Sequence, residues 1–163
     1  NNDLWKTKPH ENSIAKFKRN LKKLCNRSRA VKLELRFQMI NWLARGWINY
    51  FAIADMKKVI GNIDSQLRVM VRIVLWKQWK TFHNRARELM KLGVSAYGAY
   101  GVAMYGDRYM YVTHTPQLNK ITKVKLAQMG LINLTDYYNK RHTEIKLNRR
   151  MPNGTYGGVR GED

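Results

Sequence analysis

The stretch from Val31 to Ile53, VKLELRFQMINWLARGWINYFAI, decides the fold that this chain can adopt. Its apolar residues recur at the spacing of one face of an α-helix, and they are Leu33, Phe37, Ile40, Leu43, Trp47 and Phe51. Leu35, Met39 and Trp42 widen that face, so the pattern predicts a long central helix. Gly46 costs roughly 1 kcal/mol of helix propensity relative to Ala, and close approach of another backbone would explain it.

Two more long helices are expected on either side of this stretch. Ser13 is a suitable N-cap for a helix that runs to about Asn26, with an apolar face that includes Phe17 and Leu21. A third helix is expected from about Met56 to Trp79. Its segment 69–74 is rich in β-branched residues, but the apolar spacing on both sides favours a helix.

The second half of the chain predicts shorter elements. Helices are expected over 82–92, 95–104, 115–129 and 135–142. Gly93 and Gly130 are placed to end the first and the third of these, and Thr115-Pro116 is a strong start for the third. Residues 107–113 alternate loosely between polar and apolar and predict an extended segment.

These patterns predict a mainly α fold, with a bundle of about three long helices, shorter C-terminal helices and a basic flexible tail. Residues 1–12 read as a linker from an upstream element and 13–80 as the three-helix bundle. A smaller helical unit is expected over 81–142 and a basic, disordered tail over 143–163, where apolar residues become rare.

The charge of the chain is its second informative property. There are 31 Lys and Arg residues against 11 Asp and Glu residues, a formal net charge of +20. Such an excess favours a polyanionic partner, and nucleic acid is the first interpretation because phosphate contacts gain affinity by counterion release. An anionic membrane surface and a merely soluble basic protein are the alternatives.

The first expected helix carries a cationic stripe. Lys16, Arg19, Lys23 and Arg27 share one face, flanked by Lys18 and Lys22. An ordinary solvated helix face mixes both signs of charge, and this one has no interspersed acids. The stripe is therefore a candidate phosphate-binding surface.

Aromatic residues give a more ambiguous signal. Trp76 and Trp79 alternate with Lys77 and Lys80, and tryptophans three residues apart are more typical of a core than of a base-stacking surface. The two lysines are better candidates for phosphate contact. Tyrosines gather around Arg108, at Tyr97, Tyr100, Tyr105, Tyr109 and Tyr111. They could stack on unpaired bases or pack a small second layer.

Residues for catalysis are scattered. The acids include no Asp-Asp pair, the four histidines are isolated, and the glycines lack nucleotide-binding spacing. Cys25 is the only cysteine, on the apolar face of its helix, so an intramolecular disulfide is excluded and a nucleophilic role is not expected. No catalytic, metal or cofactor site is predicted.

No apolar run approaches the ~18 residues of a membrane span, and we expect a cytoplasmic protein without a membrane partner.

Several stretches, taken together in order and spacing, resemble the maturase-specific region of group II intron reverse transcriptases, also called the thumb or domain X. They are Trp5 to His10 followed by Ser13 and Phe17-Lys18, Arg45-Gly46-Trp47-Ile48-Asn49-Tyr50-Phe51 with Ala54-Asp55, Trp76-Lys77-Gln78-Trp79-Lys80, Arg87 with Leu89 to Gly93, Thr113 to Pro116, Gly130-Leu131 and Asp136-Tyr137-Tyr138. One departure is Arg108-Tyr109-Met110, where the family commonly has Gly-Tyr-Trp.

The resemblance implies a helical thumb that follows a polymerase palm, clamps template–primer duplex and binds structured intron RNA to assist splicing. The implied partners are these nucleic acids and the palm, and Mg²⁺ would belong to the palm. The palm's Tyr-Ala-Asp-Asp-type motif is absent here, so this chain alone is not expected to polymerise. A generic basic helical DNA- or RNA-binding domain and, less favoured, a metal-dependent nuclease are the alternatives. The candidate RNA-binding residues are Lys16, Lys18, Arg19, Lys22, Lys23, Arg27, Arg45, Lys57, Arg68, Arg72, Lys77, Lys80, Arg85, Arg87, Lys91 and Arg108.

Overall fold

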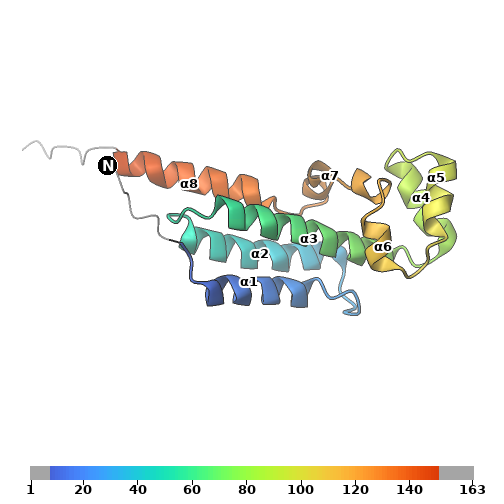
Figure 1. Cartoon of the computed structure of the whole chain (residues 1–163), viewed down its shortest axis with the longest axis horizontal. Coiled ribbons are helices and arrows are strands. Elements are labelled where there is room, and N and C mark those ends of the chain that lie inside the picture. Colours follow the sequence, from blue (N-terminus) through green and yellow to red (C-terminus); the bar gives the residue numbers. More distant parts are fainter. Residues whose placement is uncertain (1–7, 151–163) are drawn as a thin grey trace, which may run out of the picture.

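Four long helices form the body of the molecule and short helices gather at one end (Figure 1). The structure, a computed structural model, describes residues 8–150, with side chains up to 147. The long helices are α1 (Glu11–Leu24), α2 (Leu33–Phe51), α3 (Lys57–Gln78) and α8 (Leu134–Arg150). Within the described range the regular structure is helical, with no strand, which confirms the mainly α prediction.

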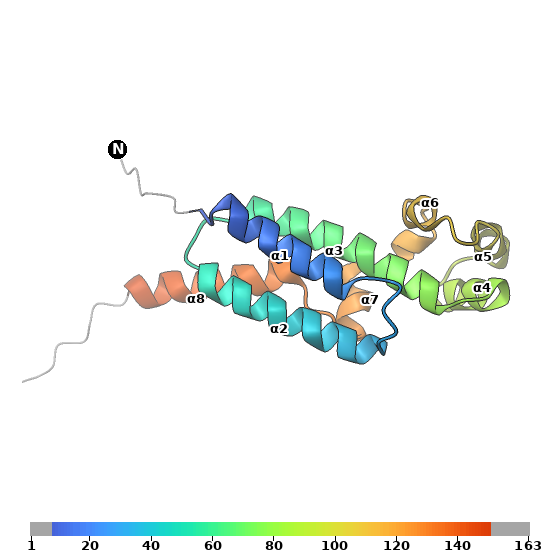
Figure 2. The same cartoon turned by 90° about the horizontal axis from the view of Figure 1, so that it is seen from below.

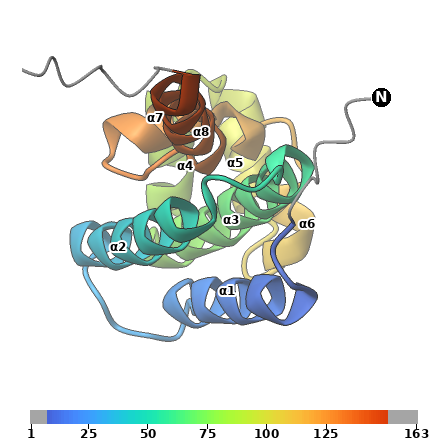
Figure 3. The same ribbon diagram turned by 90° about the vertical axis from the view of Figure 1, so that its left-hand side faces the viewer.

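Helices α1 and α8 each pack against both α2 and α3, with α1 on one face of the α2–α3 pair and α8 on the other (Figures 2 and 3). Ile40, Ala44 and Ile48 of α2 are fully buried, as are Leu67 and Val71 of α3. Burial of this apolar stripe at about 25 cal/mol per Å² is the main force that holds the bundle together. The two helices that the sequence placed at 31–53 and 56–79 are confirmed to within two residues.

Helix α1 begins two residues before the expected N-cap. His10 occupies the N-cap position, and its Nδ1 accepts a hydrogen bond from the backbone N–H of Asn12 at 3.2 Å. Ser13 instead accepts a hydrogen bond from the Trp47 indole at 3.3 Å. The expected linker is therefore wrong for Glu11 and Asn12, which are helical, and its residues 1–7 lie outside the described range.

The apolar face of α2 is narrower than expected. Trp42 is 67% exposed and Leu35 is 47% exposed, so the prediction that they widen the buried face is wrong. At 100° per residue both project away from Ile40, toward a side on which no described element packs. A Cβ added at Gly46 would meet no described atom within 4 Å, so close approach within the described chain does not explain this glycine.

Helix α8 is longer than the expected helix over 135–142. Its N-terminus is held by the Asp64 carboxylate, which accepts from the backbone N–H of Leu134 at 3.2 Å. The Tyr138 hydroxyl donates to the carbonyl of Ala54 at 2.8 Å and accepts from the N–H of Met56 at 3.2 Å. Residues 143–150 are the last turns of this helix, so the expected tail is wrong there. Its remainder, 151–163, lies outside the described residues.

The short helices are α4 (Phe82–Lys91), α5 (Ala96–Ala103), α6 (Tyr109–Thr113), the 3₁₀ turn η1 (Leu118–Lys120) and α7 (Lys123–Gln128). Helices α4 and α5 match their expected ranges, with Thr81 and Ser95 as N-caps. Gly93 and Gly130 follow their helices at φ +83° and +97°, the left-handed backbone that glycine adopts without strain.

Two sequence predictions in this region are wrong. The segment expected to be extended is helix α6, because Tyr109, Val112 and Thr113 meet the core at helical spacing. The single helix expected over 115–129 does not form: only the 3₁₀ turn η1 precedes Ile121, whose carbonyl accepts hydrogen bonds from Arg72, and α7 starts afresh with Thr122 as its N-cap.

The division into units at residue 81 stays a prediction. Helix α8 packs on α3 and α2, although its first part was placed with the smaller unit. The C-terminal helix therefore completes the long-helix bundle.

Candidate nucleic-acid interface

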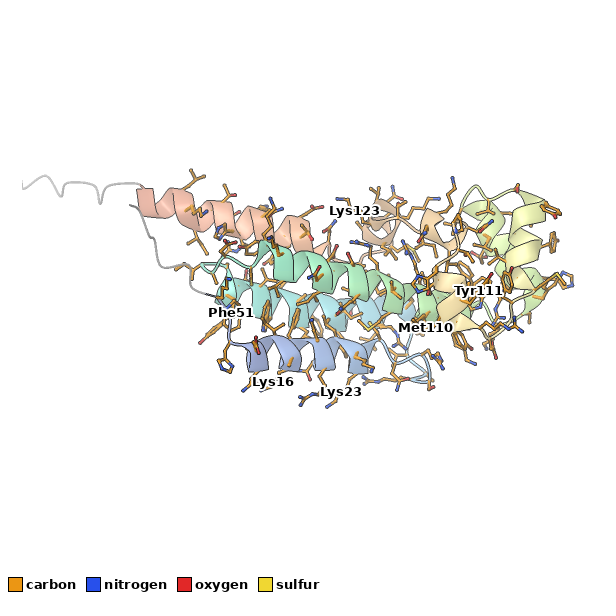
Figure 4. The ribbon with its side chains drawn as sticks, in the orientation of Figure 1. Lys16, Lys23, Phe51, Met110, Tyr111 and Lys123 are labelled. Atoms are coloured by element: carbon orange, nitrogen blue, oxygen red, sulfur yellow. The ribbon has the colours of Figure 1, made fainter. Side chains whose placement is uncertain are left out.

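The cations of α1 lie on the outside of the bundle. Phe17 and Leu21 are buried against the core and fix the orientation of the helix. Lys16 and Lys23 project away from the bundle in Figure 4. Around them Arg19 and Lys22 are exposed and Lys18 is half-buried, and none of the five cations makes an ion pair with a described residue.

A groove of about 960 Å³ runs between α1 and α3. Its α1 side carries cations, and its other side carries the apolar residues Val69, Met70 and Ile73 of α3 and Met110 of α6. The cations that line it are Lys18, Arg19, Lys22, Lys23 and Arg27. A cationic rim above an apolar floor is compatible with phosphates on the rim and apolar contacts below.

A second basic pocket, of about 670 Å³, continues from the groove. It lies between the α1–α2 loop, residues 25–32, and the end of α3, and it shares Arg27 and Ser28 with the groove. The cations that line it are Arg27, Arg29, Lys32, Arg36, Lys77, Lys80 and Arg85, and the lining has a single carboxylate, Asp107. The structure therefore brings five predicted residues of α1 and its end together with Lys77, Lys80 and Arg85 along one continuous basic surface.

Arg36 shapes this pocket and was missed by the sequence reasoning. It is 1% exposed, and its guanidinium donates to the carbonyls of Leu24, of Asn26 at 2.9 Å and of Arg29 at 2.7 Å. Burial lowers its pKa. The side chain thus holds the end of α1 and the α1–α2 loop in place. No local pattern in the sequence distinguishes it from an exposed arginine of α2.

Cys25 is the first residue of the same loop. It is 6% exposed, and burial raises the pKa of its thiol to about 12. The thiol is therefore neutral near pH 7 and unsuited to nucleophilic attack.

Arg85 is buried at the edge of the pocket, and internal contacts fix its position. Its guanidinium donates to the Asp107 carboxylate at 3.0 Å and lies over the Trp76 ring, 4.9 Å from the centroid. The Tyr109 hydroxyl also donates to Asp107, at 3.0 Å, and hydrogen bonds from Arg85 and Tyr109 lower the pKa of that carboxyl. Arg27 lies over the Tyr109 ring at 4.3 Å, so one cation of the surface is anchored by cation–π contact.

Two further predicted residues have internal partners. Arg72 donates to the Ile121 carbonyl and to the Asn119 side chain, the latter at 2.8 Å. Burial lowers its pKa. Arg68 pairs with Asp64 one turn earlier in α3. The Arg72 contacts join α3 to the segment before α7, and Arg68 pairs with the carboxylate that also accepts from the N–H of Leu134, so both arginines have a structural role independent of any ligand.

The remaining predicted residues lie apart from this surface. Arg45 is exposed on α2 and Lys57 at the start of α3. Lys91 pairs with Glu88 on α4 at 2.7 Å, and Arg87 lies 3.9 Å from the same carboxylate. Arg108 is the exposed N-cap of α6. The structure does not gather these five with the α1 stripe.

The tryptophan motif is confirmed mainly as core. Trp76 is fully buried, and its indole N–H donates to the Gly106 carbonyl at 2.8 Å. Trp79 is half-buried, and the centroid of its ring lies 6.0 Å from that of Trp76. The tyrosines divide: Tyr109 is buried, whereas Tyr97 is 94% exposed.

The described residues show neither a cluster of metal ligands nor a helix that could span a membrane. Among them no three His, Cys, Asp or Glu side chains gather closely enough to hold a metal ion. None of the helices that the structure describes combines the length and apolar character of a membrane span.

Comparison with known proteins bears on the first half of the chain. Residues 14–93 match the family model described as the group II intron, maturase-specific domain. This range contains α1 from Ile14 onward, α2, α3 and α4, and both faces of the groove except Met110. The resembling stretches beyond residue 93 lie outside the match. No curated protein matches the chain.

Proposed function

Because this chain belongs to the group II intron maturase-specific family through residues 14–93, we propose that it binds structured intron RNA and assists the folding that splicing requires. Family membership implies a maturase-type role in intron splicing. The observation that carries the RNA-binding step is the stripe of α1 cations without described acidic partners, next to a cation-rimmed groove.

The net charge alone would favour any polyanion, and the arrangement of the α1 cations predicts how binding depends on salt. Cations unmatched by carboxylates repel one another in the free protein, and phosphates that neutralise them release counterions. Each neutralised phosphate adds roughly 0.7–0.9 to the slope of log affinity against log salt. Several contacts along α1 would therefore make binding steeply dependent on salt.

The same proposal extends to the parent protein. The cationic groove would also contact template–primer duplex next to a polymerase palm, with Mg²⁺ held by that palm and polymerisation performed there. This chain would contribute binding rather than catalysis. The proposed compartment is the cytoplasm.

The test is charge reversal on α1, with Lys16→Glu, Arg19→Glu and Lys23→Glu combined. All three side chains are exposed, so helicity measured by circular dichroism should be unchanged. We expect affinity for structured intron RNA to fall about tenfold or more at ~0.1 M salt, because phosphate contacts are lost.

A matched control reverses three exposed lysines elsewhere, Lys58, Lys120 and Lys140. If it weakens binding as much as the α1 variant, the α1 surface has no special role. RNA affinity that barely changes with salt would contradict the proposal. Equal competition by random duplex DNA would favour a generic nucleic-acid-binding domain.

A further inference from the structure

We infer that the pocket between the α1–α2 loop and the end of α3 is a phosphate site that seats one phosphate group of the RNA with its nucleoside. The inference rests on the proposed function, because RNA supplies the phosphate. It differs from the α1 stripe in place: the stripe lines the groove between α1 and α3, whereas the pocket is a concavity of about 670 Å³ between the α1–α2 loop and the end of α3. That volume falls in the range of roughly 300–1,000 Å³ typical of small-ligand sites.

Positive charge converges on the pocket from two segments. Arg29 and Lys32 come from the loop, and Lys77 and Lys80 come from the end of α3. All four side chains are exposed, and none makes an ion pair with a described residue. The lone carboxylate, Asp107, already accepts hydrogen bonds from its neighbours and leaves most of this charge uncompensated.

The buried arginines supply a second, independent observation. Arg36 is 1% exposed and Arg85 is 5% exposed, and both line the pocket. The Nε of each is buried and has no hydrogen-bond acceptor among the described residues. A buried N–H without an acceptor is unfavourable, and oxygens of phosphate are the acceptors that the guanidinium fork matches best.

Backbone strain marks the same place. Lys80 has φ +51° and is the only non-glycine residue of the described chain at positive φ. It directly follows the C-cap of α3, a position where glycine is the usual choice. A lysine kept there puts an ammonium group at the pocket at the expense of local strain, which is typical of functional positions.

The pocket also has room for more than phosphate. Ala30, Val31 and Val74 are apolar members of its lining. They could contact the sugar or base of the nucleotide whose phosphate the cations hold. The site would thus fix one point of the RNA strand, while the α1 stripe tracks the strand beside it.

The first experiment uses inorganic phosphate as the probe, titrated at constant ionic strength while the melting temperature is followed. We expect phosphate to raise the melting temperature of the wild type and to leave the variant Arg29→Gln/Lys32→Gln/Lys80→Gly unshifted. The control is Lys58→Gln/Lys120→Gln/Lys140→Gln, which removes the same charge from exposed positions. The inference is overturned if the pocket variant responds to phosphate as strongly as the control.

The single variant Lys80→Gly distinguishes a role of Lys80 in the phosphate site from a role in ending α3. Glycine removes the ammonium group and relieves the positive φ, so the melting temperature without phosphate should stay equal or rise. We expect its response to phosphate to fall at the same time. An undiminished response would show that Lys80 serves only the helix terminus and would count against the site.

The second experiment measures affinity for intron-derived RNA oligonucleotides with a 5′-phosphate or a 5′-hydroxyl. The pocket variant should bind both at least tenfold more weakly than the control if the site takes an internal phosphodiester. It should lose only the advantage of the 5′-phosphate if the site takes a terminal phosphate. A loss equal to that of the control for both oligonucleotides overturns the inference.

These results are separable from the proposed function. Steeply salt-dependent RNA binding with an unaffected pocket variant would retain RNA binding and reject the phosphate site. Absence of salt-dependent RNA binding by the wild type would reject the proposed function itself, whatever inorganic phosphate does.

Discussion

The long helices and the short helices of this chain are held in place by different means. Helices α1, α2, α3 and α8 pack through continuous apolar stripes such as Ile40, Ala44 and Ile48. The end formed by α4 to α7 has helices of ten residues or fewer, and side chains that bind backbone carbonyls supplement its shorter apolar contacts. Arg72 holds the Ile121 carbonyl, Trp76 holds that of Gly106 and Lys125 holds that of Leu92.

The difference shows what each region contributes to the basic surface. The long region presents α1 as a rigid cationic face, because periodic apolar contacts set its rotation. The short region adds Asp107 and Tyr109, which anchor Arg85 and Arg27 beside the pocket. The second pocket forms where the two regions meet, because its lining combines the α1–α2 loop and the end of α3 with Arg85 and Asp107.

The largest effect on stability is expected at Trp76, a residue of α3 whose indole donates to the Gly106 carbonyl in the short region. We expect Trp76→Ala to lower the free energy of unfolding by about 3–5 kcal/mol, since the side chain is fully buried. Trp76→Phe keeps most of the packing but loses the bond to Gly106, and should cost less. Urea unfolding measures both. If Trp76→Ala lowers the free energy of unfolding no more than Trp42→Ala does, Trp76 does not hold the two regions together.

Removing the hydrogen bonds that Arg72 makes to the short region should lower the free energy of unfolding by less. Arg72→Met removes the hydrogen bonds to Ile121 and Asn119, at about 2 kcal/mol. Amide hydrogen exchange should accelerate over 118–128 before it changes in α2. Arg19→Met is the matched control on an exposed position, and uniform acceleration across both regions would contradict the division.

Alkaline pH should weaken the long region through Cys25. The folded pKa, about 12, lies above the unfolded pKa of roughly 8.5–9. Stability from the neutral thiol is therefore complete below the unfolded value and is lost as pH rises from there toward 12. Between pH 7 and 10 the wild type should lose about 1.5 kcal/mol more than Cys25→Ala. Parallel pH profiles for the two proteins would refute this assignment.

The smallest effect is expected at Trp42. This side chain is 67% exposed, so Trp42→Ala should change the free energy of unfolding by no more than about 0.5 kcal/mol. Urea unfolding beside Trp76→Ala gives the comparison directly. A large loss would mean that the outer face of α2 is covered in solution.

Helices α1, α2 and α3 were accessible from sequence because their apolar spacing repeats over several turns, whereas α8 was predicted only over 135–142 because apolar residues become rare after it. The exposure of Leu35 and Trp42 was not, because a wide apolar pattern does not say on which side a neighbour stops. The break at Ile121 was missed because its partner, Arg72, lies 49 residues away in the chain. The RNA-binding role of the candidate residues remains a proposal, which the experiments above address.

By itself, the amino-acid sequence determined the helical class, the excess of cations and the motifs of the maturase-specific family. It also placed the α1 cations on one face, because helical periodicity is a local property. Tertiary structure alone decided which cations are held by internal partners and which ones gather at the pocket. Arg36, Arg72 and Arg85 became internal ties, and Arg29 and Lys80 came to face one pocket. The physical reason is that burial and pairing depend on residues distant in sequence, which packing alone brings together.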